Sequence, residues 1–231
     1  SEMVTNTLAF FDNTKEVLSG KIITITAGPT REALDPVRYI SNHSSGKMGY
    51  AIAEAALKLG ATVNLISGPV AISCEKDINR MNVSSATEMH KVSLELAPKS
   101  DIFIACAAVA DYRPVDVKTQ KIKKSDDEIV ISMIKNPDIV QDVSQLKENR
   151  PFVVGFAAET QDVEVYAKEK MQRKNLDMIC ANDVSIATQG FNSDQNALKV
   201  YYKDGSKDLP LADKSDIALK LLQLIHQQLI P

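Results

Sequence analysis

Apolar residues follow two periods along this chain, and the two periods alternate. Residues 21–27 are mostly apolar and β-branched, and they end at Gly28-Pro29, where a strand must stop. Between residues 48 and 59 the apolar positions recur at helical spacing, and Gly60 follows where a helix commonly ends. Residues 61–67 are apolar again and predict a second strand. The chain thus opens with a β-loop-α-β unit whose loop is much longer than the few residues usual between a strand and a helix.

The same alternation continues to the C-terminus and predicts an α/β fold, a Rossmann-like three-layer sandwich with a mostly parallel central sheet. Asn136 is expected to cap a helix whose first turn holds Pro137, and Asp204-Gly205 predicts the turn of a C-terminal hairpin. Residues 115–128 are rich in lysine and poor in apolar side chains, so we expect a mobile flap or the tip of a hairpin there. Further strands are predicted over residues 78–84, 101–108, 128–134, 152–157, 176–181, 198–202 and 209–211, and further helices over residues 86–96, 136–146, 162–174 and 212–229.

Composition narrows the class of protein. With 231 residues, 44% of them hydrophobic, the chain can form one sizeable domain, expected over residues 21–231 after an N-terminal extension or linker remnant over residues 1–20. The net charge of −3 argues against a nucleic-acid-binding surface, and no apolar run reaches the roughly 20 residues of a membrane span. The three cysteines lack metal-ligand spacing and are predicted to be reduced. We expect a cytoplasmic protein without nucleic-acid or membrane partners.

Common nucleotide-binding and hydrolase motifs are absent from the sequence. Ser41 stands where a Walker A loop requires glycine before Gly46-Lys47, and Met48 stands where it requires serine or threonine. No GxGxxG follows the first strand, which argues against the usual mode of NAD binding, and HExxH, CxxC and GxSxG are also missing. Candidate functional residues are therefore expected at the carboxyl ends of the strands, where α/β sheets bind their ligands.

Three polar residues near the predicted strand ends each allow two interpretations. Asn42 could donate to an oxyanion, or it could shape the loop through an Asx-turn. Arg38 could hold a phosphate or carboxylate, or it could form a surface ion pair. Asp111 could bind Mg²⁺ beside a triphosphate, or it could cap the turn that follows its strand.

Several lysines and one phenylalanine are ambiguous in the same way. Lys121 and its neighbouring lysines form either a solvated charge run or a flap that covers a phosphate chain. Lys170 and Lys174 share one helical face, where they could complement the helix dipole or bind an anion. Phe156 is either a core residue or a ligand contact.

The motifs taken together resemble those of a known family. In order along the chain stand TAGPTRE, DPVRYISNHSSGKMG, AAVADYRP, KIKK, NPDIV, VGFAAET and ANDVS. This set closely resembles bacterial phosphopantothenoylcysteine synthetase, the CTP-dependent ligase of coenzyme A biosynthesis, from about residue 21 to the C-terminus.

The resemblance implies a reaction in two steps. 4′-Phosphopantothenate attacks the α-phosphate of CTP to give an acyl-cytidylate and pyrophosphate, and the amine of L-cysteine then displaces CMP. Such an acyl transfer needs cationic groups around the triphosphate and a donor for the carbonyl oxygen, not a protein nucleophile. The resemblance also implies Mg²⁺, a homodimer, and in many bacteria a fusion to a flavin-dependent decarboxylase, whose flavin is not expected in this chain.

The resemblance also implies roles for individual residues. Asn42 and Lys121 would be catalytic, and Asp111 would hold the metal. Arg38, Asn42 and Ala108 would bind phosphopantothenate, and the loop around Arg38 or the flap could act across a subunit boundary. The residues implied in nucleotide binding are Ala105, Cys106, Ala107, Asp111, Lys121, Pro137, Asp138, Ile139, Val140, Phe156, Lys170 and Lys174.

Two other classes of protein stay open at this point. An NAD(P)-dependent or nucleotide-sugar oxidoreductase could share the fold, although it should carry a glycine fingerprint and an acidic ribose ligand. A non-catalytic partner subunit could keep the fold with an inactive site, although Asn42, Asp111 and Lys121 are all present.

Overall fold

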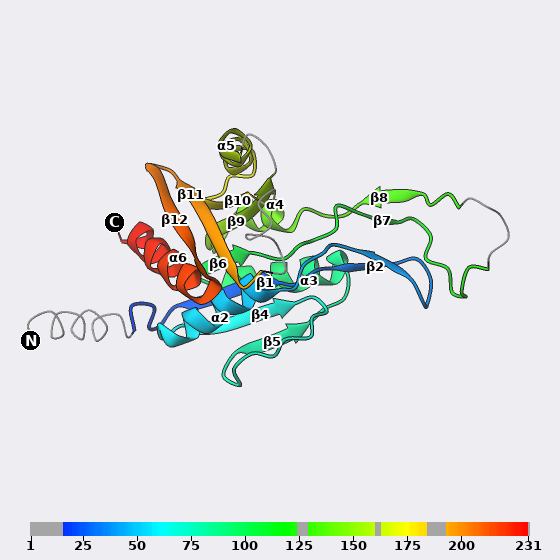
Figure 1. Cartoon of the computed structure of the whole chain (residues 1–231), viewed down its shortest axis with the longest axis horizontal. Helices are drawn as coiled ribbons and strands as arrows, with labels where there is room; N and C mark the ends of the chain where they lie inside the picture. Colours follow the sequence, from blue (N-terminus) through cyan, green and yellow to red (C-terminus); the bar gives the residue numbers. More distant parts are fainter. Residues whose placement is uncertain (1–15, 124–128, 160–162, 184–192, 231) are drawn as a thin grey trace, which may run out of the picture.

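An eight-stranded sheet forms the centre of the computed structural model, which describes residues 16–123, 129–159, 163–183 and 193–230 (Figure 1). In spatial order its strands are β12 (Gly205–Asp213), β11 (Gln195–Tyr202), β10 (Met178–Asp183), β9 (Phe152–Glu159), β6 (Ile102–Ala105), β1 (Ile22–Ala27), β4 (Thr62–Ser67) and β5 (Asn79–Asn82). Neighbouring strands are parallel from β10 to β5, whereas β11 pairs antiparallel with both β10 and β12. The predicted mostly parallel sheet with a C-terminal hairpin is confirmed.

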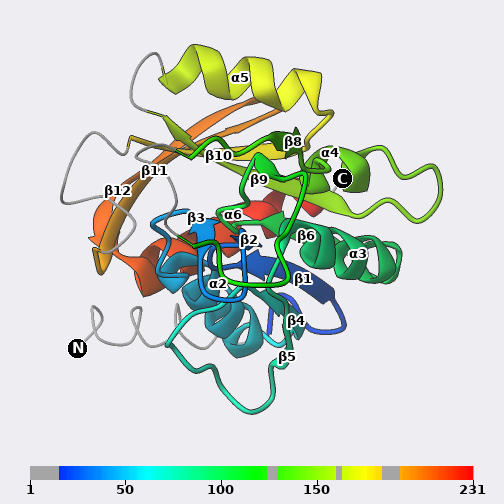
Figure 2. The same ribbon diagram turned by 90° about the vertical axis from the view of Figure 1, so that its right-hand side faces the viewer.

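Helices cover both faces of this sheet and complete the predicted three layers (Figure 2). The buried positions of the first and last helices recur at three- and four-residue spacing, so each helix packs one apolar face on the sheet. One face is covered by α2 (Lys47–Lys58) and α6 (Lys214–Leu229), and the other by α3 (Ala86–Leu96), which continues into the short η1 (Ala97–Lys99), by α4 (Ile139–Ser144) and by α5 (Val163–Arg173).

Two short hairpins project from the carboxyl end of the sheet; the first was not predicted, and the second agrees with the hairpin tip expected over residues 115–128. The first hairpin, β2 (Arg31–Ala33) and β3 (Tyr39–Ser41), fills the long loop after β1. The second, β7 (Tyr112–Pro114) and β8 (Met133–Lys135), carries the predicted flap between its strands. We call residues 31–41, 112–123 and 129–135 the arm, which extends away from the sheet in Figure 1. The amide of Lys118 donates to the Leu34 carbonyl at 3.0 Å, so the two hairpins are joined.

The predicted start of α4 is wrong. The helix begins at Ile139, and the side chain of Asp138 caps it by accepting from the amide of Gln141 at 3.2 Å. Asn136 is instead only 6% exposed and donates its side-chain amide to the Ala110 carbonyl at 2.8 Å. Asn136 therefore joins the base of the arm to the sheet, and Pro137 precedes the helix instead of forming its first turn.

Several predicted strands are shorter in the structure, and the strand predicted over residues 78–84 is reduced to β5. The strand predicted over residues 101–108 ends at Ala105, because the following backbone turns toward the loop after β1, where Ala108 donates to the Gly28 carbonyl at 2.9 Å. The strand predicted over residues 128–134 is replaced by β8, with residues 129–132 outside any strand. Along the portion of the chain that the structure describes, no helix is both long and apolar enough to cross a membrane.

Some predictions fall on residues outside those described. These are most of the N-terminal extension (residues 1–15), the end of the flap with Lys124 (residues 124–128) and the predicted start of α5 at Asp162. Flap mobility and the division into an extension and one domain stay predictions. Residues 16–20, within the predicted extension, form a turn whose Leu18 is fully buried in the core between α2 and the sheet.

Candidate active site

Two adjacent cavities open at the carboxyl ends of the central strands. We call the first, of about 160 Å³, cavity A; it lies between the ends of β6 and β9, the segment before α4, and α5. Most of the residues implied in nucleotide binding line it, namely Ala105, Ala107, Asp111, Pro137, Asp138, Ile139, Val140, Phe156, Lys170 and Lys174. Residues far apart in the sequence thus meet at one cavity.

The strand register explains this meeting. Ala105, the last residue of β6, lies beside Thr26 near the end of β1 and beside Gly155 of β9, which continues to Glu159. The hydroxyl of Thr26 accepts from the amide of Ala107 at 3.2 Å and holds the turn that follows β6. A Cβ on Gly155 would lie 2.7 Å from the Leu176 side chain, so the glycine permits close packing beside the cavity.

Cavity A carries mixed charge. Lys174 forms an ion pair with Asp138 at 2.6 Å between Nζ and Oδ2, with only 14% of the lysine side chain exposed. Lys170 lies one turn earlier on α5 and lines the same cavity. Asp111 is exposed and also lines cavity A, and its carbonyl accepts from the amide of Asn136 at 2.8 Å. Two lysines and a carboxylate around one opening suit a ligand that carries phosphates and a metal ion.

Asn42 and Ala108 lie together near the junction of the cavities. The Asn42 side-chain amide donates to the Ala108 carbonyl at 3.1 Å, and the amide of Thr30 donates to the same oxygen at 3.2 Å. The Asn42 side chain is thus held at the end of the turn after β6 and not by an Asx-turn of its own loop. An amide at this position can donate to a ligand oxygen with a small rotation.

Arg38 and Lys121 line neither cavity. The guanidinium of Arg38 contacts the buried carboxylate of Asp35 at 2.6 Å and the Ile122 carbonyl at 3.1 Å, so in this chain it forms the ion pair that was its alternative role. The Arg38 guanidinium holds the pKa of Asp35 well below its usual range. Lys121 is exposed on the arm next to Ile122. The arm therefore carries two implied site residues away from the cavities of its own chain.

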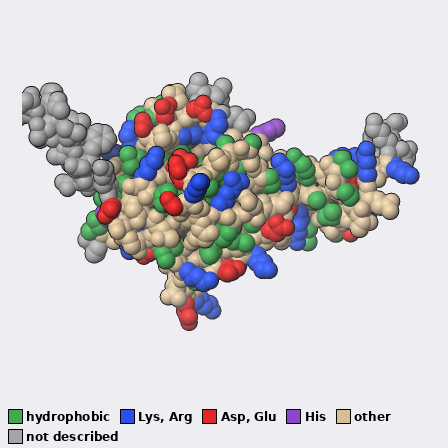
Figure 3. Space-filling model, turned by 90° about the horizontal axis from the view of Figure 1, so that it is seen from below, with side chains coloured by type: hydrophobic (Ala, Val, Ile, Leu, Met, Phe, Trp, Pro, Cys, Tyr) green, Lys and Arg blue, Asp and Glu red, His purple; other side chains and the backbone are tan. Residues whose placement is uncertain are grey.

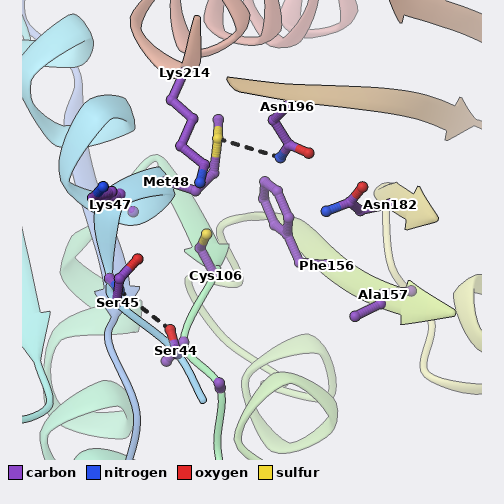
Figure 4. Close-up of a pocket in the computed structure, with 15 residues that line it drawn as sticks. Ser44, Ser45, Lys47, Met48, Cys106, Phe156, Ala157, Asn182, Asn196 and Lys214 are labelled. Carbon is purple, nitrogen blue, oxygen red and sulfur yellow. Dashed lines mark hydrogen bonds between the residues drawn. The ribbon is translucent and has the colours of Figure 1, made fainter. Parts of the chain in front are cut away.

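The second cavity, of about 140 Å³, lies on the other side of Phe156, and we call it cavity B. It shares Ala107 and Phe156 with cavity A and also includes Ala108. Figure 4 shows Phe156 among the residues that line cavity B. Cys106, implied in nucleotide binding, lines cavity B and not cavity A. Burial raises the pKa of the Cys106 thiol to about 12, so the side chain is a neutral thiol.

Sequence reasoning missed several residues of cavity B. Lys214, in the first turn of α6, is 7% exposed and donates to the Ser193 carbonyl. Burial lowers the pKa of Lys214, and the nearby Lys47 adds to the effect. A lysine at a helix start has the pattern of a surface residue, so no sequence signal marked it. Others that were missed include Lys47, Met48, Asn182 and Asn196.

Comparison with known proteins assigns the chain to a family. The sequence model of the DNA/pantothenate metabolism flavoprotein C-terminal domain matches residues 18–229. The chain belongs to this family. Membership agrees with the resemblance that the sequence motifs carry, because the curated relatives are named for coenzyme A biosynthesis.

Individual members of the family match over nearly the whole chain. The coenzyme A biosynthesis bifunctional protein CoaBC of Vibrio cholerae is 59% identical over 230 residues, which cover 99% of this chain and 57% of that protein. The protein of the same name from Haemophilus influenzae is 60% identical and covers 98% of this chain and 56% of that protein. The crystal structure of the C-terminal domain of CoaBC is 41% identical, with a TM-score of 0.79 over 93% of this chain and 98% of that domain. The chain thus spans little more than half the length of the curated relatives.

Proposed function

We propose that the chain is the ligase that joins 4′-phosphopantothenate to L-cysteine with CTP in coenzyme A biosynthesis. The observation that carries the proposal is that cavity A gathers the residues implied in nucleotide binding, with Asn42 and Ala108 beside it. The names of the relatives, which are coenzyme A biosynthesis proteins, support the same pathway. In the cell we expect the chain in the cytoplasm, joined to or associated with a decarboxylase domain.

In the first step a carboxylate oxygen of phosphopantothenate forms a bond to the α-phosphorus of CTP, and pyrophosphate leaves with the electron pair. Lys170 and Lys174 stand where the triphosphate would lie and can stabilise its charge. Asp138 keeps Lys174 oriented through their 2.6 Å ion pair. Asn42 would donate to the acyl carbonyl oxygen, which gains negative charge when the amine attacks in the second step.

The residues present fit a Mg²⁺ ion that arrives with the nucleotide. Among the described residues, no three His, Cys, Asp or Glu side chains cluster to form a complete metal site. Mg²⁺ commonly keeps several waters and uses one or two carboxylates together with substrate phosphates. Asp111 is the suitable carboxylate of cavity A, because Asp138 is engaged with Lys174. When bound, the ion would neutralise charge on the phosphates.

We propose that two copies of the chain pair through the arm. Apolar side chains that are about half or more exposed gather on the arm, where Figure 3 shows them on the projecting part of the molecule. Contiguous apolar surface of this kind marks interaction sites. Pairing would bring the Arg38 and Lys121 of one subunit toward the cavities of its partner. The exposed apolar residues are Val37, Tyr39, Tyr112, Val115, Val117, Ile129, Val130 and Ile134.

The function is tested by incubating the protein with 4′-phosphopantothenate, L-cysteine, Mg²⁺ and either CTP or ATP. We expect CMP and the cysteine conjugate, with CTP strongly preferred because a pyrimidine-sized pocket excludes adenine. Lys174→Gln should impair use of CTP. Lys168→Gln is the matched control, because Lys168 lies on the same helix but pairs with Glu164 at the surface. Absence of the conjugate with every nucleotide would refute the proposal.

A further inference from the structure

Cavity B adjoins the residues that are expected to hold the acyl group. Ala108, whose carbonyl accepts from Asn42, lines this cavity, and Phe156 lines both cavity B and cavity A. With the nucleotide in cavity A and the acyl group beside Asn42, the cytidylate leaving group would occupy cavity A. An amine attacks an acyl carbon across the face of its carbonyl group, and cavity B is the adjoining space that the nucleotide would leave open.

Lys214 places a buried cation in this cavity. Its side chain points toward Met48 and Phe156 in Figure 4, and the residue is only 7% exposed. Its ammonium donates a hydrogen bond to a neutral group, the Ser193 carbonyl. The nearby carboxylate of Asp194 is paired with Lys47 at 2.6 Å. Removing a cation from water is unfavourable unless an anion compensates it, and a carboxylate bound in cavity B would do so.

The remaining wall of cavity B is soft and polarizable. The sulfur of Met48 accepts from the side-chain amide of Asn196 at 3.8 Å, and the Cys106 sulfur and the Phe156 ring complete this wall. Sulfur and aromatic groups make favourable contacts with a thiol. Because the pKa of Cys106 is about 12, this wall adds no negative charge that would repel a carboxylate.

We propose that cavity B binds L-cysteine, with its α-carboxylate on the ammonium of Lys214 and its thiol against Met48 and Phe156. The amine then faces the acyl carbon beside Ala108. Its nitrogen forms the C–N bond, the C–O bond to the cytidylate phosphate breaks, CMP leaves with that electron pair, and one amine proton passes to solvent. This inference rests on the proposed ligase function and assigns Lys214 to substrate binding.

The test compares two amines that differ in the carboxylate. Wild-type protein should use L-cysteine far better than cysteamine, which lacks that group. In Lys214→Met, kcat/KM for L-cysteine should fall about 100-fold, as expected for loss of one partner of a buried charge pair, while that for cysteamine should change less than about threefold. Lys220→Met, an exposed lysine on the same helix, is the control and should leave both values unchanged.

Two further variants keep the inference testable if Lys214→Met does not fold. Lys214→Arg keeps the cation and should retain a clear preference for cysteine. Asn196→Asp places a competing carboxylate in the cavity and should reduce that preference. A cysteine-to-cysteamine ratio that is unchanged in Lys214→Met, or in Asn196→Asp, would overturn the cysteine site.

A separate measurement distinguishes failure of the proposed ligase function from failure of the proposed cysteine site. Wild-type protein with CTP, Mg²⁺ and 4′-phosphopantothenate, but without any amine, should form the acyl-cytidylate. If it does not, the ligase function and the cysteine site are both refuted. If the acyl-cytidylate forms but the amine preference does not depend on Lys214, only the cysteine site is refuted.

Discussion

Replacing Asn136 by alanine should destabilise the protein more than its position in a loop suggests. The residue is 6% exposed and lies between β8 and α4, at the base of the arm. Its side-chain nitrogen donates to the Ala110 carbonyl at 2.8 Å, and its side-chain oxygen accepts from the guanidinium of Arg113 at 3.0 Å. Ala110 is itself 7% exposed, so water cannot readily replace the lost donor.

The magnitude follows from these two bonds. A neutral hydrogen bond contributes about 1 kcal/mol net, and one to a charged group about 1.5–3 kcal/mol. Arg113 keeps its second hydrogen bond, to the Lys135 carbonyl at 3.0 Å, so losing its bond to Asn136 should cost a free energy near the lower end of the range for charged groups. We expect Asn136→Ala to lower the free energy of unfolding by roughly 2–4 kcal/mol, which for a chain of this size lowers Tm by roughly 4–16 °C.

Urea denaturation followed by circular dichroism measures this change. Asn79→Ala is the matched control, because Asn79 also makes a side-chain amide bond, to Asn64 at 3.0 Å, but at an exposed position on the edge strand. The control should cost less than about 0.5 kcal/mol. If Asn136→Ala costs no more than Asn79→Ala, the reasoning about the buried carbonyl is wrong.

Four further predictions concern the site and its supports. Asn42→Asp should still release pyrophosphate but form the amide about a hundredfold more slowly, so that mass spectrometry of a quenched reaction finds accumulated acyl-cytidylate. Gly49→Ala places a Cβ 2.6 Å from a β1 side chain and should lower the free energy of unfolding in urea by about 1–3 kcal/mol. Gly205→Ala is the control and should be tolerated, because the nearest atom to a Cβ there would be 3.5 Å away. Burial raises the pKa of the Cys106 thiol to about 12, so its neutral form should contribute fully to stability below about pH 8.5, the pKa of a cysteine in the unfolded chain. This contribution should be lost as the pH rises toward 12, and thiolate absorbance should report the titration. Full ionisation of Cys106 at pH 9 in the folded protein would contradict the prediction. Lys121→Gln should slow acyl-cytidylate formation, and CTP with Mg²⁺ should reduce hydrogen exchange in residues 115–123 of the wild type; unchanged exchange would argue against a closing flap.

The sequence by itself determined the sheet, the layers and most of cavity A. Helical and strand periods located α2, α3 and α6 and the parallel strands, because burial of one apolar face is a local property of each element. The family resemblance also implied Lys174, Asp138 and Phe156, which the structure brings to a single cavity. Parallel strands end at the same edge of a sheet, so the residues that directly follow them lie close together and their proximity does not depend on the conformation of the loops.

Only the tertiary structure decided the arm, the role of Asn136 and the contents of cavity B. The hairpins of the arm are three-residue strands with exposed apolar residues, and they depend on contacts such as that of Asp35 with the amide of Ile122 at 3.1 Å. Asn136 has the sequence pattern of a helix cap, but a buried carbonyl 26 residues away competes for its side chain. Lys214 has the pattern of a surface residue and is buried because β11, α2 and α6 close around it. Periodicity reports only which face of an element is apolar, whereas the position of a polar side chain depends on partners distant in the sequence.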